Sequence, residues 1–272
     1  MKTFQWFYKG VRLAGTTWEP ETTDRAIVVV HGIGEHMGRY DYFAHHFMQH
    51  NYVVTGVDHY GHGNSAGKRG TTKGYDFNFD YLDAFIRYVK EEYGKPVVLY
   101  GHSMGGGIVA GYLLTRQPDI LAAVLSAPAL LLAREPSKLL TRTVGALSKI
   151  APDFRIDQGV DIDKISHLPE VVHSLKNDPL HFDKVSLQLA YEMVANGEWC
   201  IENAHLLRIP TLLMHGDADE FTSIKGSDRF AAKAPAQFLS YKIWPGAFHE
   251  LHADTERDEI LGFVAGWLSQ IQ

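Results

Sequence analysis

Several features that mark particular classes of protein are scarce in this sequence. It has one cysteine, Cys200, which excludes an internal disulfide framework and fits a reducing compartment. The formal net charge is −6 and no run of basic residues exceeds two, so we predict no nucleic-acid partner. The longest mostly apolar run, residues 120–133, is broken by Ser126 and Pro128 and is too short to span a bilayer.

Signals for export, cofactors and metals are also missing. The first six residues lack the apolar segment of a signal peptide, so we predict a cytoplasmic protein without a signal peptide or transmembrane segment. The glycines at 105–107 lack the G-x-G-x-x-G spacing of a dinucleotide site, and no P-loop lysine pattern occurs. The run from His249 to His252 is one residue short of the H-E-x-x-H zinc motif. We predict neither a cofactor nor a metal ion.

What the sequence does contain is an alternation of strand and helix patterns within an ordinary globular composition, 45% hydrophobic and 21% charged. The continuous apolar run at 26–30 suits a strand that is covered on both faces. Further strands are expected at 52–57, 96–100, 122–125, 211–214 and 239–244, and helices at 40–50, 77–93, 106–116, 223–233 and around 260–271. With an N-terminal hairpin of 4–8 and 11–18, this predicts an α/β fold, a mainly parallel central sheet with helices on both faces.

The alternation lapses between residues 129 and 207, where the sequence reads as helices and loops inserted after a strand. Insertions that follow strand ends lie above the edge of the sheet where binding sites form. We therefore predict a core domain made of residues 1–128 and 208–272, and a helical cap made of residues 129–207 over the site.

The most informative motif is the stretch Gly101-His102-Ser103-Met104-Gly105, which joins a strand pattern to a helix pattern. G-x-S-x-G in this context is typical of a nucleophile elbow, in which the glycines relieve crowding at a sharp turn. The helix N-terminus also favours negative charge that develops at the serine. Ser103 is therefore the candidate nucleophile, although the pentapeptide alone fits a chance serine in a glycine-rich turn equally well.

A serine nucleophile needs a base and an acid that orients the base. Asp217 and Asp219 follow the strand pattern at 211–214, and His249 follows the pattern at 239–244. In an α/β fold with a nucleophile elbow, the expected chain order is serine, then acid, then histidine, as found here. The carboxyl ends of parallel strands gather at one edge of a sheet, so the three side chains can meet there. We predict His249 as the base and one of the two aspartates as the acid, because the residues alone hardly separate them.

Two backbone N–H groups are expected to stabilise the oxyanion of an acyl-transfer reaction. One is that of Met104, the residue after the candidate nucleophile, and the other is that of Ile33 in the loop after the strand at 26–30. Gly32 and Gly34 on either side of Ile33 allow the backbone to approach closely. A glycine-rich turn without a catalytic role is the alternative.

Six stretches, taken together, resemble the monoacylglycerol lipase family of α/β-hydrolases, which overlaps with lysophospholipases of similar sequence. They are residues 31–40, 58–63, 101–106, 177–180, 215–219 and 246–252. The resemblance covers the chain from about residue 4 to the C-terminus and implies an α/β-hydrolase fold with a cap insertion. It assigns the nucleophile to Ser103 and the base to His249. Of the two aspartates it favours Asp219.

The resemblance also implies roles for residues outside the catalytic group. Arg39 and His252 match positions that tie the oxyanion loop to the histidine loop. Glu170 and Asn177 lie in the predicted cap, where the family recognises the glycerol part of its substrate.

The implied activity is that of a serine hydrolase that cleaves carboxylic esters of lipids through an acyl-enzyme and without a cofactor. Monoacylglycerol, split into glycerol and a free fatty acid, is the expected substrate. A lysophospholipase, a general carboxylesterase or an aminopeptidase on the same scaffold is the alternative. A catalytically inactive binding module is a more remote one.

An acyl chain needs an apolar wall, and the first helical pattern of the predicted cap offers one. Leu140, Val144 and Leu147 fall on one stripe of residues 137–151, and we predict that this stripe lines an acyl tunnel. Three cations off the stripe would let the entrance rest against a membrane or lipid surface. They are Lys138, Arg142 and Lys149. The alternative is that the stripe only packs the cap onto the core.

Overall fold

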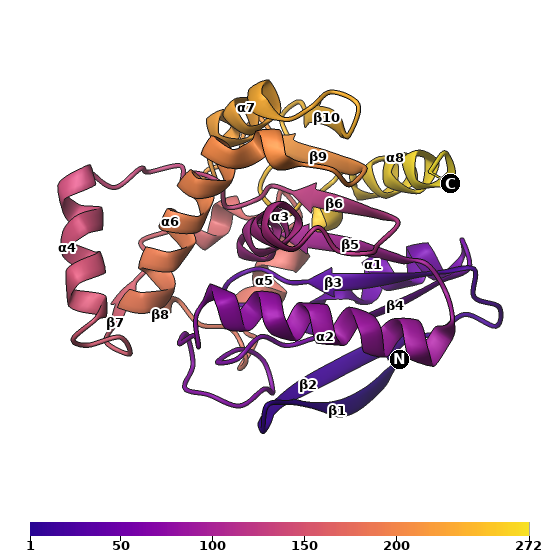
Figure 1. Ribbon diagram of the computed structural model, residues 1–272, viewed down its shortest axis with the longest axis horizontal. Coiled ribbons are helices and arrows are strands. Elements are labelled where there is room, and N and C mark those ends of the chain that lie inside the picture. Colours follow the sequence, from indigo (N-terminus) through magenta and orange to yellow (C-terminus); the bar gives the residue numbers. More distant parts are fainter. Residues whose placement is uncertain (272) are drawn as a thin grey trace.

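The computed structural model describes residues 1–271, and an eight-stranded sheet runs through its middle in the order β1-β2-β4-β3-β5-β6-β9-β10 (Figure 1). The strands are β1 (Lys2–Tyr8), β2 (Val11–Trp18), β3 (Arg25–Val30), β4 (Tyr52–Val57), β5 (Val97–His102), β6 (Ala122–Ser126), β9 (Thr211–Gly216) and β10 (Leu239–Trp244). Neighbours from β4 to β10 pair in parallel, and β2 pairs antiparallel with both β1 and β4. The predicted hairpin and the mainly parallel sheet are confirmed.

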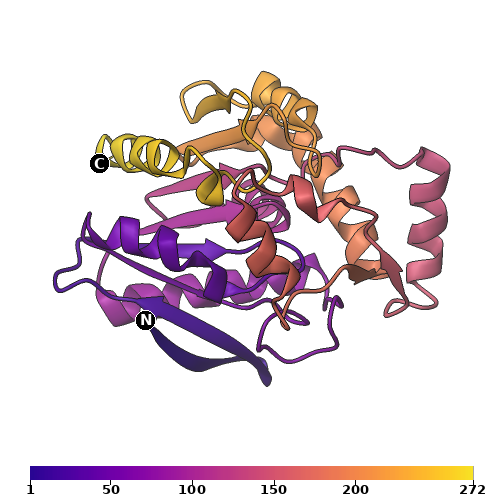
Figure 2. The ribbon, with the colours of Figure 1, turned by 180° about the vertical axis from the view of Figure 1, so that it is seen from behind.

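Helices cover both faces of this sheet, as predicted. The helices α2 (Tyr75–Tyr93), α3 (Met104–Arg116) and α7 (Ile224–Lys233) contribute to the core on one face, and α1 (Asp41–Met48) and α8 (Arg257–Ser269) to the core on the other (Figure 2). Side chains of β5 alternate accordingly, since Leu99 joins the first core and Tyr100 the second. Burial on both faces explains why the parallel strands are continuous apolar runs.

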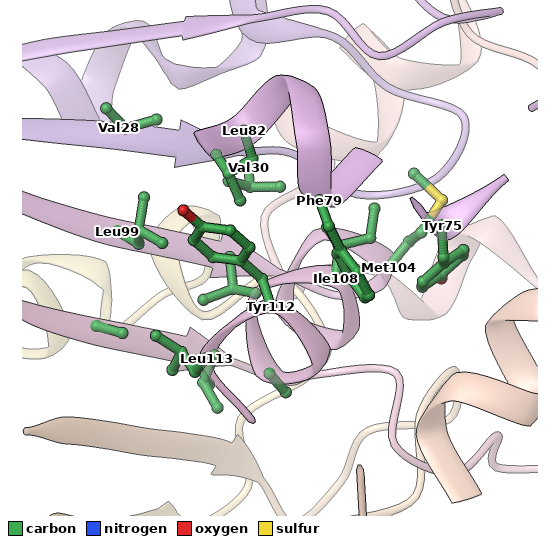
Figure 3. Packing of buried hydrophobic residues seen from close by; sticks show 14 of the residues in the cluster. Val28, Val30, Tyr75, Phe79, Leu82, Leu99, Met104, Ile108, Tyr112 and Leu113 are labelled. Atoms are coloured by element: carbon green, nitrogen blue, oxygen red, sulfur yellow. The ribbon is translucent and has the colours of Figure 1, made fainter. Parts of the chain in front are cut away.

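The core under α2 and α3 is packed from aromatic and branched side chains. Figure 3 shows Tyr112 and Ile108 of α3 lying between the strand residues and Phe79 of α2. All three side chains are buried, and burying a side chain of this kind stabilises a fold by about 1.5–3 kcal/mol. This packing holds α3, and with it the strand-to-helix turn at its N-terminus, firmly against the sheet.

The segment between β6 and β9 contains α4 (Lys138–Ser148), β7 (Arg155–Asp157), α5 (Pro169–Lys176), β8 (Lys184–Ser186) and α6 (Leu187–Asn203). β7 and β8 form a small antiparallel pair that the sequence patterns did not indicate, because each strand has only three residues. The amide of Asn196 in α6 donates to the carbonyl of Gly107 in α3 (2.8 Å). Helix α4 lies outside α6, away from the sheet (Figure 1). The division into a core and a separate cap stays a prediction, since α6 also contributes Cys200 to the main core.

Several helix boundaries differ from the predicted ones by a few residues, as in α2, which begins at Tyr75 rather than 77, and α8, which spans Arg257–Ser269 rather than about 260–271. The helix expected at 40–50 begins as a 3-10 turn at Met37–Tyr40 before α1, and the helix expected at 106–116 begins two residues earlier, at Met104. Further 3-10 turns are Ile162–Lys164, Ala204–Leu206 and Leu251–Ala253. Within residues 1–271, no helix combines the length and the apolar character needed to cross a membrane.

Candidate active site

The turn between β5 and α3 consists of a single residue, Ser103. Its backbone has φ 54° and ψ −119°, a left-handed conformation that costs a non-glycine residue about 1–3 kcal/mol. The space around it requires glycine on both sides. A Cβ on Gly105 would lie 1.9 Å from the carbonyl oxygen of Val30, and one on Gly101 would lie 2.7 Å from that of Gly105. The turn therefore has the strained geometry of a nucleophile elbow.

The ends of β9 and β10 bring two further side chains to this serine. Ser103 Oγ lies 2.9 Å from His249 Nε2, and His249 Nδ1 lies 2.7 Å from Asp219 Oδ2. Because the carboxylate can only accept, Nδ1 carries the proton and Nε2 is left to accept the serine hydroxyl. The ring of Phe221 lies almost parallel to the imidazole, with centroids 4.9 Å apart. This arrangement can remove the proton of Ser103 during an attack on a carbonyl carbon.

The pKa values of Asp219 and His249 are shifted in opposite directions by their contact. Burial raises the pKa of Asp219, but the neighbouring His249 and His215 more than offset this and hold it far below its usual range. Three donors from Phe221 and Thr222 also bind the Asp219 carboxylate, at 2.7–3.1 Å. Burial lowers the pKa of His249, and the Asp219 carboxylate overcomes that effect so that its pKa is raised above 6.5. The ionised carboxylate thus stabilises a protonated imidazole.

The structure separates the two candidate acids. Asp217 is exposed, and its Oδ1 accepts the backbone N–H of Gly246 (2.6 Å) in the turn after β10. Asp219 is the carboxylate that meets His249. The resemblance favoured the same residue.

The loop after β3 lies directly against the elbow. A Cβ on Gly32 would be 3.2 Å from that of Ser103, which shows how close the loop comes to the serine. Met104 is the first residue of α3, so its N–H has no partner within the helix. Ile33 lies beside Gly32 in the wall of the same cavity as Ser103. The use of both N–H groups as oxyanion donors stays a prediction.

A buried ionic network joins this loop to the loop that carries His249. Arg39 forms a double hydrogen bond with Glu250 (2.5 and 2.8 Å) and a third bond with Glu35 (3.0 Å). Glu35 in turn accepts the N–H of Gly32 (2.5 Å). Arg39 therefore lies where the resemblance implied, between the two loops. We missed both glutamates, although carboxylates inside glycine-rich motifs at strand ends were a signal that they are buried and paired.

His252, the other predicted support, acts through packing rather than through a hydrogen bond. Its buried ring stacks on Tyr40 with centroids 4.8 Å apart, and its edge meets His102 at 4.9 Å. Burial lowers its pKa to about 4, so the ring is neutral around pH 7.

One cavity has Ser103 in its lining, and a second cavity adjoins it. The first, here called the catalytic cavity, has a volume of about 560 Å³ and is lined by Ser103, His249 and a mixture of charged and apolar side chains. The second, here called the apolar cavity, has a volume of about 230 Å³ and extends under α4 and α6. Residues common to both linings form the wall between them: Ile33, Gln158, Val160, Asp161 and Phe221. Leu140 and Val144, both predicted for an acyl tunnel, line the apolar cavity.

Three other predicted binding residues do not line either cavity, and we correct these assignments. Leu147 is 46% exposed, because the side of α4 that faces the apolar cavity is that of Val144. Glu170 is exposed in the first turn of α5. Asn177 is also exposed, and its amide donates back to the carbonyl of His173 (2.8 Å). Its neighbour Asp178 lines the catalytic cavity instead.

Neutral histidines hold the loops around the site. His31 Nε2 accepts the N–H of His59 (3.0 Å), and its Nδ1 donates to the carbonyl of Gly32 (2.8 Å). His59 Nε2 donates to the carbonyl of His31 (3.0 Å), and its Nδ1 accepts the hydroxyl of Tyr81 (2.5 Å). Protonation of His31 would place a hydrogen of Nε2 against the N–H of His59, which is also a donor. Within residues 1–271, no three His, Cys, Asp or Glu side chains are grouped to hold a metal ion.

Acid should therefore destabilise the fold. Five buried histidines have a pKa below 6.5 because burial disfavours their charged form, about 4 for His59 and about 3 for His62. His252 has a pKa of about 4, and the pKa values of His31 and His102 lie well below 6.5. The unfolded chain binds these protons near its own histidine pKa of about 6.5, so stability is lost as the pH falls from there toward 4.

We expect the free energy of unfolding to fall by several kcal/mol from pH 7 to pH 5, since each histidine contributes up to about 1.4 kcal/mol per pH unit. Urea unfolding followed by circular dichroism at several pH values measures this slope. The variant His62→Gln removes one titrating group. Its free energy of unfolding should therefore change less steeply with pH, by the equivalent of about one bound proton. A wild-type stability that is unchanged between pH 7 and pH 5 would contradict the prediction.

A largely parallel sheet, a serine on a strained strand-to-helix turn, and a histidine and aspartate from later strand ends define a serine hydrolase with the α/β-hydrolase fold. The family model described as "Serine aminopeptidase, S33" matches residues 21–256. The chain is 33% identical to a monoacylglycerol lipase of Mycolicibacterium smegmatis, over 95% of this chain and 93% of the other. It belongs to the monoacylglycerol lipase family, as the sequence motifs implied.

Similarity extends to distant organisms and to solved structures. The human monoglyceride lipase is 31% identical, over 93% of this chain and 85% of the other. The crystal structure of the Paleococcus ferrophilus monoacylglycerol lipase superposes with a TM-score of 0.87 at 31% identity, covering 95% of this chain and 98% of that one. The chain is therefore an enzyme of the lipase and esterase class.

Proposed function

We propose that the enzyme hydrolyses monoacylglycerols to glycerol and free fatty acids, with Ser103, His249 and Asp219 as its catalytic triad. The observation that carries this proposal is the position of the serine. Ser103 lines the catalytic cavity, whose wall carries several charged side chains, and this cavity shares a wall with the apolar cavity. A monoacylglycerol has the same two parts, a polar alcohol and an apolar chain on either side of one ester bond.

The first half of the reaction forms an acyl-enzyme. Ser103 Oγ attacks the ester carbonyl carbon while His249 Nε2 takes the hydroxyl proton. Asp219 holds the imidazole in the correct tautomer and stabilises its positive charge. The N–H groups of Met104 and Ile33 bind the oxyanion, and one such donor typically lowers the barrier by about 3 kcal/mol. The tetrahedral intermediate then expels the alcohol, to which His249 returns the proton.

The second half releases the fatty acid. His249 takes a proton from a water molecule as that water attacks the acyl-enzyme carbonyl. The second tetrahedral intermediate breaks its bond to Ser103, and His249 gives the proton back to the serine oxygen. The product is released as the carboxylic acid, which gives its own proton to solvent to become a carboxylate, and the enzyme returns to its starting state.

Burial of the acyl chain is the reason for assigning it to the apolar cavity. Each methylene removed from water contributes about 0.8 kcal/mol to binding, so a cavity lined by aliphatic side chains favours long acyl groups. Val144 and Leu140 of α4 form part of this lining, opposite Met193 and Val194 of α6. The two helices thus supply the apolar wall that the strand ends lack.

Charge in the catalytic cavity supports a neutral leaving alcohol over a phosphate headgroup. Its wall includes Asp161, Asp178 and Asp183. The cations in the wall are already paired, since Arg39 binds two glutamates and Lys176 binds Asp163 (2.5 Å). A phosphate would therefore meet carboxylates without a free cation, whereas glycerol hydroxyls can donate to them.

The test is a substrate panel measured as kcat/KM. We compare long-chain monoacylglycerols with lysophosphatidate, a short-chain nitrophenyl ester and an aminoacyl anilide. The expected order places monoacylglycerol first, with lysophosphatidate at least about tenfold lower. Preference for lysophosphatidate or for the anilide would replace the proposal by a lysophospholipase or an aminopeptidase.

A charge in the apolar cavity should discriminate against long chains. We expect Val144→Asp to lower kcat/KM for a long-chain monoacylglycerol by about tenfold or more, the equivalent of losing two buried methylenes. Hydrolysis of an acetate ester should stay near the wild-type rate, because acetate does not reach α4. Leu147→Asp is the matched control, since it adds the same charge to the same helix outside the cavity. Equal losses on both substrates would mean that Val144 serves only to pack α4.

The proposal also includes contact between the predicted cap, residues 129–207, and a lipid surface. Three apolar side chains at the outer end of the molecule support it: Leu139 is 76% exposed, Ile150 82% and Phe154 62%. Exposed apolar groups beside cations fit the interface of an anionic membrane. The cations are Lys138, Arg142 and Lys149, which all lie along one side of α4.

A further inference from the structure

Asp254 is a fully buried carboxylate to which the reaction steps above assign no role. Its Oδ1 accepts the backbone N–H groups of His167 (2.7 Å) and Thr255 (3.0 Å). Its Oδ2 accepts the backbone N–H of Phe248 (2.9 Å) and faces His167 Nδ1 at 3.0 Å. A buried anion with this many donors is costly to replace, because each donor would lose its partner.

These contacts join the loop that carries the base to the segment 165–168, which precedes α5. Phe248 and Glu250 flank His249, and both of their N–H groups are bound here. That of Phe248 binds Asp254, and that of Glu250 binds the carbonyl of Ile165 (3.0 Å). The ring of Phe248 also stacks on His167, with centroids 3.6 Å apart. The backbone after the base is thus bound to this segment directly, at Ile165. The backbone before the base is bound to it through Asp254, which also accepts the N–H of His167.

A second set of bonds makes the junction rigid. Ser166 Oγ donates to the carbonyl of Ala253 (2.7 Å) and accepts the N–H of Leu168 (3.0 Å). Burial raises the pKa of Asp254, but its N–H donors and His167 overcome this and keep the pKa below its usual value. The carboxylate is therefore charged at neutral pH, and its bonds are charge-assisted.

We propose that Asp254 is a positioning residue for the hydrolysis, one that fixes His249 against Ser103 by fastening the histidine loop to residues 165–168. This rests on the proposed function, in which His249 is the base. The base must stay within hydrogen-bond reach of both Ser103 and Asp219, and a misplacement of about 1 Å can cost about 100-fold in rate. The carboxylate provides that accuracy without contact with the substrate.

The test separates positioning from substrate binding. We expect Asp254→Ala to lower kcat by about 100-fold with little change in KM, on a long-chain monoacylglycerol and an acetate ester alike. The rate at which a fluorophosphonate labels Ser103 should fall by a similar factor, since labelling also needs the base. Asp254→Asn, which keeps one acceptor oxygen, should recover part of both rates. His167→Ala, which removes one donor and the stacked ring, should lose less than Asp254→Ala.

A stability control excludes a merely structural role. Val53→Ala removes buried methyl groups from β4, away from both cavities, and should lower Tm without lowering kcat. If Asp254→Ala fails to fold, Asp254→Asn and His167→Ala carry the test. The inference is overturned if the wild type is active and every folded variant of Asp254 and His167 has the same kcat and labelling rate as the wild type. A wild type that hydrolyses none of the esters and resists labelling overturns the proposed function itself, and the positioning role with it.

Discussion

Replacing Ser103 by alanine should lower kcat for ester hydrolysis by roughly 10⁶-fold, the loss typical of removing the nucleophile of a triad. The hydroxyl supplies the attacking oxygen, and neither His249 nor the oxyanion donors can replace it. The fold should persist, because alanine meets the same backbone restriction as serine at φ 54° and keeps the Cβ contacts of the turn. Steady-state kinetics on a nitrophenyl ester, with circular dichroism and Tm, measure both outcomes.

Ser126 provides a matched control for this substitution. It ends the neighbouring strand β6, its carbonyl accepts the N–H of Ser103 (3.0 Å), and its own hydroxyl is buried without a hydrogen-bond partner within residues 1–271. Ser126→Ala should therefore leave activity and fluorophosphonate labelling close to wild type. Residual turnover above about one per cent in purified Ser103→Ala would remove Ser103 from its assigned role.

The fold could be predicted because its signals are local. A parallel strand buried on both faces is a continuous apolar run, as in β3 and β5, and each such run is followed by a helix pattern. The elbow is equally local, since crowding between β5 and α3 requires glycine at 101 and 105. Chain order then placed His249 and the two candidate acids, Asp217 and Asp219, at strand ends that meet at one edge of the sheet, and the resemblance favoured Asp219.

The supporting contacts could not be predicted in the same way. Arg39 and Glu250 lie 211 positions apart, and no periodic pattern links them. The position of α4 depends on its packing against α6, so the sequence placed Leu147 on the same apolar stripe as Val144 although only Val144 reaches the cavity. Asp254 resembles a surface residue at a helix start until residues 165–168 are folded over it.

Asp219→Asn should lower kcat by about 10⁴-fold, whereas Asp217→Asn should change it by less than about threefold. An asparagine at 219 can present an N–H to His249 Nδ1, which favours the tautomer with its proton on Nε2 and leaves no acceptor for the serine hydroxyl. At 217 the carboxylate only accepts the N–H of Gly246, and an amide oxygen can do the same. Kinetics of both variants on one ester give the comparison.

The pH profile adds a second readout for the same pair. The Asp219 carboxylate raises the pKa of His249, and the reaction needs the neutral imidazole, so activity in the wild type is lost as the pH falls through that raised pKa. Without the carboxylate, burial lowers the pKa of His249 against only the weaker opposing effects of Glu250 and Glu35, so the acid limb of kcat/KM in Asp219→Asn should move to lower pH. The limb of Asp217→Asn should coincide with that of wild type. A larger loss of kcat in Asp217→Asn than in Asp219→Asn would identify Asp217 as the acid. So would an acid limb that shifts in Asp217→Asn and coincides with that of wild type in Asp219→Asn.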